Sequence, residues 1–202
     1  MPSYHSILNH DINSIPISCG FPLISFELNK QPILDFKKIK EKSINVDILD
    51  EALTYYRLNI LFKNYPLKSE ADKIIVYATV FLSKCLEIFH SNYNDAKKTK
   101  DALKELIIEA EWSPNYKTHF LNGILINSSS NKNNVNSNSN SYSQSEVSSL
   151  QKYLKQIRTE LVFRLNCILF DNENALNKNK FWLSYSKKKF LGYEMPMTNK
   201  LK

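Results

Sequence analysis

The feature that most limits the fold of this chain is a helical stretch near its middle that carries almost no charge. Every residue from Ile74 to Leu82 is uncharged, and most of them are large and apolar. The apolar pattern then continues through Cys85, Leu86, Ile88 and Phe89. A helix that is apolar on nearly every side has no face to present to water, so other helices must surround it. The stretch therefore predicts a buried central helix.

A membrane-spanning helix is the alternative interpretation of the same stretch. Crossing a bilayer takes about 20 consecutive apolar residues. The charged residues Lys73, Lys84 and Glu87 enclose a run that is only about half that long. We therefore expect the stretch to lie in a protein core, and we expect no membrane span.

Two helices joined by a short turn are predicted between residues 47 and 89. The first carries Leu49, Leu53, Tyr56 and Ile60 at spacings of four, three and four residues, which is the apolar stripe of an amphipathic helix. Tyr65-Pro66 should end this helix, because a residue before proline avoids the helical region. The second helix should begin near Glu70, since Ser69 and Asp72 form a pattern close to a capping box.

The second half of the chain predicts three more helices. One runs from Asp95 to Glu111, and a long one begins at Ser148, where Gln151 completes another capping box. The apolar stripe of the long helix is Leu150, Leu154, Ile157, Leu161, Leu165 and Ile168, and the residues expected off this stripe are Lys152, Lys155, Arg158 and Glu160. A last helix covers residues 179–191 and stops at Gly192. The expected fold is all-α, a single domain over residues 1–202 in which about five helices include one central apolar helix surrounded by the others.

A polar tract separates the two halves. From Asn127 to Ser149, 17 of 23 residues are Ser or Asn, and the large apolar residues are Val135, Tyr142 and Val147. Such a composition cannot bury enough apolar surface to offset the entropy lost on ordering. We expect a disordered insertion at residues 127–149 that acts as a spacer. A phosphorylatable or partner-binding tether is the alternative function for it.

The glycines and cysteines argue against several classes of site. The three glycines are far apart in the sequence, so a glycine-rich phosphate loop is absent. The cysteines Cys19, Cys85 and Cys167 are odd in number and lack the spacing of metal ligands. Cys85 and Cys167 lie among apolar helical residues, and the first residues contain no export signal. These features favour a reduced cytoplasmic protein with no cofactor and no metal site.

The titratable residues form no arrangement typical of an enzyme. None of the four histidines has a helical partner that would complete a metal site, and His5 is expected to hydrogen-bond within the N-terminal segment. Asp50 and Glu51 are adjacent, so they point to different sides of a helix and cannot act on one substrate. Helix capping and the helix dipole explain them sufficiently. The sequence predicts no catalytic residue.

Positive charge is the remaining functional signal. The formal net charge is +7, which implies an acidic partner. The lysines near the C-terminus would supply that charge by themselves; they are Lys178, Lys180, Lys187, Lys188, Lys189, Lys200 and Lys202. Because Trp182 and Tyr185 are interleaved with them, a groove that binds bases and phosphates is one interpretation. In the other, the rings face the core and the lysines are solvated.

Three groups of residues resemble one known family. The first group is Asp47-Ile48-Leu49-Asp50-Glu51-Ala52, Phe62-Lys63-Asn64-Tyr65 and Ser69-Glu70-Ala71-Asp72. The second is Pro2-Ser3-Tyr4-His5-Ser6, and the third is Tyr153 to Arg158, Arg164-Leu165, Phe170-Asp171 and Trp182 to Phe190. These groups closely resemble actin-related protein 2/3 complex subunit 3, a small helical subunit of the assembly that nucleates branched actin filaments. The matching segments follow the same order along the chain as in that family.

The resemblance implies a non-catalytic structural subunit of the actin cytoskeleton in the cytoplasm. Its partners would be the actin-related proteins and other subunits of the same complex, above all the larger actin-related subunit, together with the actin filament. ATP binding would belong to the actin-related subunits. The alternative function is a basic nucleic-acid-binding helical module. The predicted partner interface consists of Lys63, Asn64 and Tyr65, which match the family motif and could equally be a satisfied helix end, and of Lys187, Lys188 and Lys189.

A deletion tests the spacer interpretation of the polar tract. Excising Ser129 to Ser143 should leave thermal stability and assembly unchanged, because a disordered spacer contributes to neither. Thermal unfolding and co-purification with partner subunits measure the two properties. Loss of either would contradict the spacer interpretation.

Overall fold

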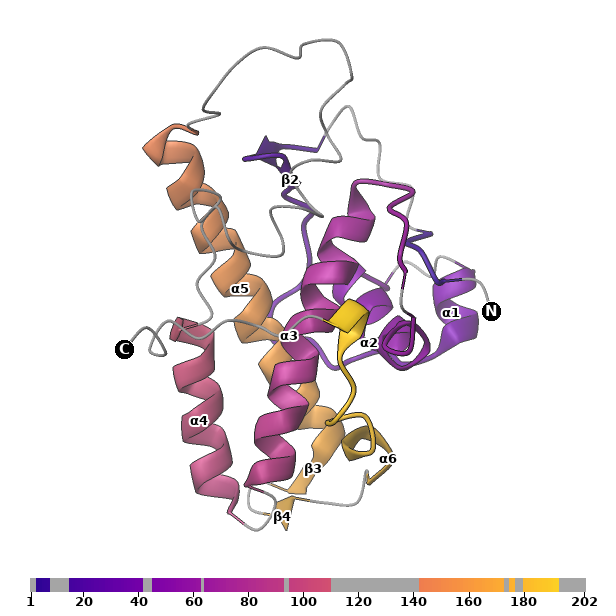
Figure 1. Ribbon diagram of the computed structural model, residues 1–202, viewed down its shortest axis with the longest axis vertical. Coiled ribbons are helices and arrows are strands. Elements are labelled where there is room, and N and C mark those ends of the chain that lie inside the picture. Colours follow the sequence, from indigo (N-terminus) through magenta and orange to yellow (C-terminus); the bar gives the residue numbers. More distant parts are fainter. Residues whose placement is uncertain are drawn as a thin grey trace.

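The computed structural model describes residues 3–7, 15–41, 45–62, 64–92, 95–109, 142–172, 175–176 and 180–192. Helices dominate these residues (Figure 1). The elements are, in order, β1 (Ile17–Ser18), β2 (Phe21–Pro22), α1 (Phe36–Lys40), α2 (Ile48–Asn59), α3 (Ala71–Ser91), α4 (Ala96–Glu109), α5 (Gln144–Leu169), β3 (Phe170–Asn172), β4 (Ala175–Leu176), α6 (Lys180–Leu183) and the 3₁₀ helix η4 (Phe190–Gly192).

Helix α3 is the central element, as the sequence predicts. Its residues from Ala71 to Leu82 are all buried, and α2, α4, α5 and α6 pack against it (Figure 1). Within the described residues, α3 is long and apolar enough to cross a membrane by length and composition. Its enclosure by these neighbours is instead the arrangement of a core helix.

The predicted end of the first helix is wrong. Helix α2 begins after its N-cap Asp47 as expected, but it ends at Asn59 instead of at Tyr65-Pro66. The Phe62 N–H donates to the Asn59 carbonyl at 2.9 Å, a tight i−3 bond that closes the last turn. The connection to α3 is therefore longer than the sequence suggests.

The predicted cap of the second helix is half right. The side chain of Asp72 does accept a hydrogen bond from the Ser69 backbone N–H, at 3.2 Å. The Ser69 hydroxyl oxygen, however, is buried and has no hydrogen-bond partner within the described residues. The helix starts at Ala71 with Glu70 as its N-cap, and Glu70 makes no side-chain capping bond.

The boundary of the polar tract also needs correction. Helix α5 begins at Gln144, and Ser143 with Glu146 forms its capping box, so the expected start at Ser148 is wrong. Val147 is buried and Ser145 to Ser149 are helical. Residues 127–141 of the predicted insertion lie outside the described residues. The excision of Ser129 to Ser143 proposed above would also remove Ser143, the N-cap of α5. Loss of such a cap costs about 0.5–2 kcal/mol. A deletion that tests the spacer alone should therefore end at residue 141.

The predicted last helix is broken in the structure. Helix α6 is four residues long, and turns separate it from η4. The Tyr185, Ser186 and Lys188 N–H groups donate to carbonyls three residues back, which tightens the chain after α6. The break allows both Trp182 and Phe190 to be 1% exposed. Helix α4, by contrast, lies within the predicted range of residues 95–111.

Two short antiparallel hairpins qualify the all-α prediction. In β1–β2, Ser18 pairs with Phe21 across Cys19 and Gly20, whose φ values of 50° and 73° suit a two-residue type I′ turn. In β3–β4, Phe170 pairs with Leu176 directly after α5. The sequence signals of both are too short for hydrophobic periodicity to detect.

A charged substitution tests the burial of α3. Phe81→Asp and Thr79→Asp should each cost about 4 kcal/mol or more and unfold the chain, because both side chains are 0% exposed and a lone buried charge is not compensated. Circular dichroism and solubility measure the result. Ile108→Asp is the matched control, since Ile108 is 67% exposed on α4; full helicity in the Phe81 variant would contradict the packing.

Candidate functional site

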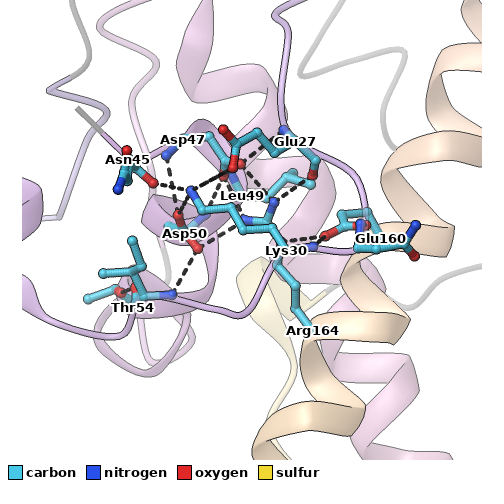
Figure 2. Close-up of polar contacts among 11 residues, drawn as sticks. Glu27, Lys30, Asn45, Asp47, Leu49, Asp50, Thr54, Glu160 and Arg164 are labelled. Carbon is cyan, nitrogen blue, oxygen red and sulfur yellow. Dashed lines mark hydrogen bonds and ion pairs between the residues drawn. The ribbon is translucent and has the colours of Figure 1, made fainter. Parts of the chain in front are cut away.

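The buried guanidinium of Arg164 connects α5 to the start of α2. Figure 2 shows Arg164 reaching from α5 to the start of α2. Its Nη1 and Nη2 atoms donate to the two carboxylate oxygens of Asp47, both at 2.7 Å, and Nη1 also donates to Asp50 at 2.9 Å. Its Nε atom donates to Glu160 at 2.8 Å. Bidentate pairing of this kind is the strongest geometry available to an arginine and a carboxylate.

The same carboxylates hold the loop before α1. Lys30 Nζ lies 2.7 Å from Asp50 Oδ2 and also donates to the Asn45 carbonyl (Figure 2). Glu160 accepts the backbone N–H groups of Asn29 and Lys30 at 2.7 and 3.2 Å. The loop is thus attached to both α2 and α5. We name Lys30, Asp47, Asp50, Glu160 and Arg164 the arginine cluster.

The electrostatics of the cluster favour the charged forms of Asp47 and Arg164. Burial alone would raise the pKa of the Asp47 carboxyl, but the hydrogen bonds and positive charge of Arg164 outweigh it, so this pKa lies below its ordinary value. Burial would lower the pKa of Arg164, and the hydrogen bonds and charge of Asp47 raise it instead. Every carboxylate of the cluster is paired with a cation or a backbone donor, which is the condition for burying charge.

A second polar cluster holds the N-terminal segment. The Asp72 carboxylate accepts from the Ser6 N–H at 2.9 Å and from the Lys68 N–H at 2.8 Å. Glu51 accepts from the Ser6 hydroxyl at 2.6 Å and from the Ile7 N–H at 2.9 Å. Asn59 bonds both the N–H and the carbonyl of Tyr4, at 2.9 and 2.8 Å. We name Asp72, Glu51 and Asn59 the N-terminal clamp.

Asp50 in the arginine cluster and Glu51 in the N-terminal clamp do more than cap a helix. Both side chains are fully buried, and each binds a distant segment of the chain. Capping and the helix dipole are therefore not sufficient to explain them. They do point to different segments, as their adjacency on α2 predicts.

Ser3, His5 and Asp72 lie in the order of a hydrolase relay. Ser3 Oγ is 2.8 Å from His5 Nε2, and His5 Nδ1 is 2.9 Å from Asp72 Oδ2. The bond to Ser3 confirms the expected hydrogen bond of His5 within the N-terminal segment. Asp72 Oδ2 also accepts from the backbone of Lys68 and Ser69, so it holds two chain segments together. Anchoring the N-terminal segment accounts for all of these contacts.

The structure places the predicted interface residues in different environments. Tyr65 is 5% exposed; its hydroxyl donates to the Tyr4 carbonyl at 2.9 Å and its ring packs on His5 and Phe190. Asn64 is exposed, and Lys63 lies outside the described residues. Lys187, Lys188 and Lys189 are all exposed after α6.

The rings between the C-terminal lysines face the core. Trp182 is 1% exposed and stacks on Tyr56 with ring centroids 5.8 Å apart. Tyr185 is partly buried and packs on Tyr56 edge-on. The indole is thus unavailable for stacking on a base, and of the two interpretations the one with core-facing rings describes Trp182.

Periodicity missed the polar residues that organise the core. The apolar stripe places Arg158 and Glu160 off the buried face, but they are 3% and 2% exposed. Arg158 bonds the Tyr77 hydroxyl at 2.8 Å and the Ile107 carbonyl at 2.9 Å, which joins α5 to α3 and α4. Arg164 follows Leu161 by three residues, so its position on the stripe was the available signal.

Comparison with known proteins gives one consistent family. The family model described as P21-Arc: ARP2/3 complex ARPC3 (21 kDa) subunit matches residues 1–195. "Actin-related protein 2/3 complex subunit 3" of Dictyostelium discoideum is 30% identical over 195 residues, covering 93% of this chain and 97% of that protein. Its counterpart of the same name in Arabidopsis thaliana is 30% identical over 188 residues, covering 93% and 96%. That of Entamoeba histolytica is also 30% identical, covering 94% and 89%.

Removal of Arg164 tests the arginine cluster. Arg164→Met should cost about 3–5 kcal/mol, because Asp47, Asp50 and Glu160 lose a buried cation that Lys30 does not fully replace. Urea unfolding followed by circular dichroism measures this. Lys104→Met is the control, since the Lys104–Asp101 pair is exposed and should change stability by less than about 1 kcal/mol.

The same variant has a pH signature. Because the Asp47 pKa is lower in the folded chain than in the unfolded chain, its stabilisation is complete above the ordinary carboxyl pKa of about 3.9 and is lost as the pH falls through the folded value. Arg164→Met removes the cause of the lowered pKa, so its stability should fall less steeply below pH 4. An unchanged acid slope would contradict the assigned charge state.

Proposed function

This chain belongs to the ARPC3 family of ARP2/3 complex subunits, and on that premise we propose that it packs against the larger actin-related subunit and contacts the pre-existing actin filament. The membership establishes a non-catalytic structural subunit that supports nucleation of branched actin filaments together with the other subunits of the complex. The observation that carries this assignment is the match over nearly the full length of both chains. The actin cytoskeleton of the cytoplasm is the setting of the proposal.

The mechanism open to such a subunit is positional. The arginine cluster fixes the loop before α1 to α2 and α5, and the N-terminal clamp fixes residues 4–7 to α2 and α3. The backbone that carries the exposed side chains of these elements is therefore held in place before a partner arrives. A preorganised surface loses less conformational entropy on binding, which supports affinity without any chemical step.

We assign the filament contact to the exposed lysines after α6. Lys187, Lys188 and Lys189 stand together on the surface, and the chain has a net charge of +7. Actin surfaces are acidic, so charge complementarity favours encounter with a filament. Asn64 is assigned to the contact with the larger actin-related subunit, together with Lys63. Tyr65 acts from inside the chain, where its ring supports the connection between α2 and α3 that carries Asn64.

The alternative of a basic nucleic-acid-binding module is not supported. The family match concerns subunits of the ARP2/3 complex, and Trp182, the largest ring among the lysines, is buried against Tyr56. A nucleic-acid groove would need its rings exposed to bases.

Charge reversal tests the filament contact. The triple variant Lys187→Glu, Lys188→Glu and Lys189→Glu, incorporated in the purified complex, should bind actin filaments about tenfold more weakly at low salt, because it replaces attraction by repulsion. The difference should shrink as the salt concentration rises and screens the charges. Co-sedimentation with filaments over a salt series measures both effects.

A matched triple variant serves as the control. Lys97→Glu, Lys98→Glu and Lys104→Glu make the same charge change at exposed positions of α4 and should leave filament binding nearly unchanged. Equal effects of the two variants would show a general charge effect and contradict the assigned contact. Dissociation of the complex by the first variant would assign these lysines to a subunit instead of the filament.

A further inference from the structure

An open groove lies between the N-terminal segment, α1, α2 and α6. Its volume is about 440 Å³, within the range of about 300–1,000 Å³ that is typical of ligand pockets. The side chains that matter for its chemistry are Tyr4, Phe36, Arg57, Leu58, Phe181 and Tyr185. Four of these six carry aromatic rings, so the groove offers a large apolar contact surface.

Two large apolar side chains on the rim of the groove are exposed to solvent. Leu58 is 38% exposed and Phe181 is 54% exposed. Clustered exposed apolar side chains mark protein-binding sites far more than the same residues scattered singly.

The charge in the groove is positive. The Arg57 guanidinium lies over the rings of Phe181 and Trp182, 5.0 and 5.4 Å from their centroids. The Arg57 Nε atom is buried and has no hydrogen-bond partner in the described part of the chain. Lys40 Nζ lies 4.8 Å from the centroid of Phe36, and the described residues that line the groove include no acidic one. A lysine or arginine of a partner is therefore disfavoured, and the positive charge of the Arg57 guanidinium favours a partner carboxylate.

The walls of the groove are already fixed. The backbone of Tyr4 is held by Asn59, and the Tyr4 ring packs edge-on against Phe36 at 5.6 Å. Phe181 and Tyr185 pack edge-on at 5.6 Å on the opposite element. Such a groove needs little reorganisation to bind, which favours a specific occupant.

We propose that this groove binds a segment of another subunit of the complex in which a large apolar side chain stands within two residues of an Asp or Glu. The apolar side chain enters between the aromatic rings and Leu58, and the carboxylate pairs with Arg57. The inference rests on the proposed function, since it names the chemistry of one contact through which the subunit is held in the assembly.

A cross-link in the assembled complex tests the identity of the occupant. The photoreactive residue p-benzoyl-L-phenylalanine replaces Phe181 on the groove rim, the purified complex is irradiated, and the linked peptides are identified by mass spectrometry. The expected product joins position 181 to another subunit, within a segment that contains an apolar residue next to an Asp or Glu. Cross-links only to actin, to a second copy of this chain, within the chain itself, or to a segment without a carboxylate would each overturn the proposal.

Two substitutions test the energetics of the contact. Leu58→Glu adds negative charge to the apolar rim, and Arg57→Gln removes the carboxylate donor; each should weaken retention of the subunit in the complex by about tenfold or more. Arg57→Lys keeps the charge without the planar fork and should recover part of the loss. Size-exclusion chromatography of the diluted complex measures retention, and thermal unfolding of each variant confirms that the chain is folded.

A control variant and the assembly of the wild-type chain distinguish failure of the groove proposal from failure of the proposed function. Ile108→Glu makes the same chemical change as Leu58→Glu at an exposed site on α4 and should leave retention unchanged. If the wild-type chain assembles and the folded Leu58 and Arg57 variants assemble equally well, the groove proposal is wrong and the proposed function stands. If the wild-type chain does not assemble with actin-related proteins, the proposed function itself fails.

Discussion

The pairing of Arg164 with Asp47 and Asp50 is the interaction on which the rest of the structure depends. The two carboxylates have a double duty: they cap α2 and they also bind the guanidinium that arrives from α5. Once α2 is placed in this way, its later side chains Glu51 and Asn59 can bind the N-terminal segment. The position of residues 4–7 therefore depends in part on a charge pair in the first turn of α2. Removing Arg164 would leave buried carboxylates incompletely paired, which explains why a polar group can determine the arrangement of an apolar core.

The core combines two kinds of contact with different roles. Apolar burial around α3 supplies the driving force, but it is not directional and would tolerate several packings of the neighbouring helices. Hydrogen bonds from buried polar groups select among those packings, because each donor must meet its acceptor. Arg158 does this for α3, α4 and α5, and Lys73 does it for the β1–β2 hairpin through the Gly20 carbonyl at 2.7 Å.

Helices with a long, regular hydrophobic period can be predicted from the sequence. Features that depend on the contacts of single residues cannot. The central helix, the stripe of α5 and the start of α2 follow from hydropathy and capping patterns. Hydropathy does not identify Arg158, Glu160 and Arg164 as core residues, because charge is normally evidence of exposure and most of their partners lie far away in the sequence. The break after α6 has no local breaker; it results from the burial of Trp182 and Phe190 in one core. Of the predicted interface, Tyr65 has the family motif and yet serves the interior, since a motif does not say on which side of the chain a residue acts.

The arginine cluster also has a consequence for the order of synthesis. Arg164 binds groups of Asp50, Asp47 and Glu27 that precede it by 114, 117 and 137 residues. Contacts of such long range form late and slow the search for the native topology. Most of the polypeptide must have left the ribosomal exit tunnel before Arg164 emerges. The apolar surface of α3 is outside the tunnel by then. During translation, the apolar helix α3 is therefore synthesised before Arg164. In that interval its apolar surface is open to aggregation, which is the situation in which chaperones bind nascent chains.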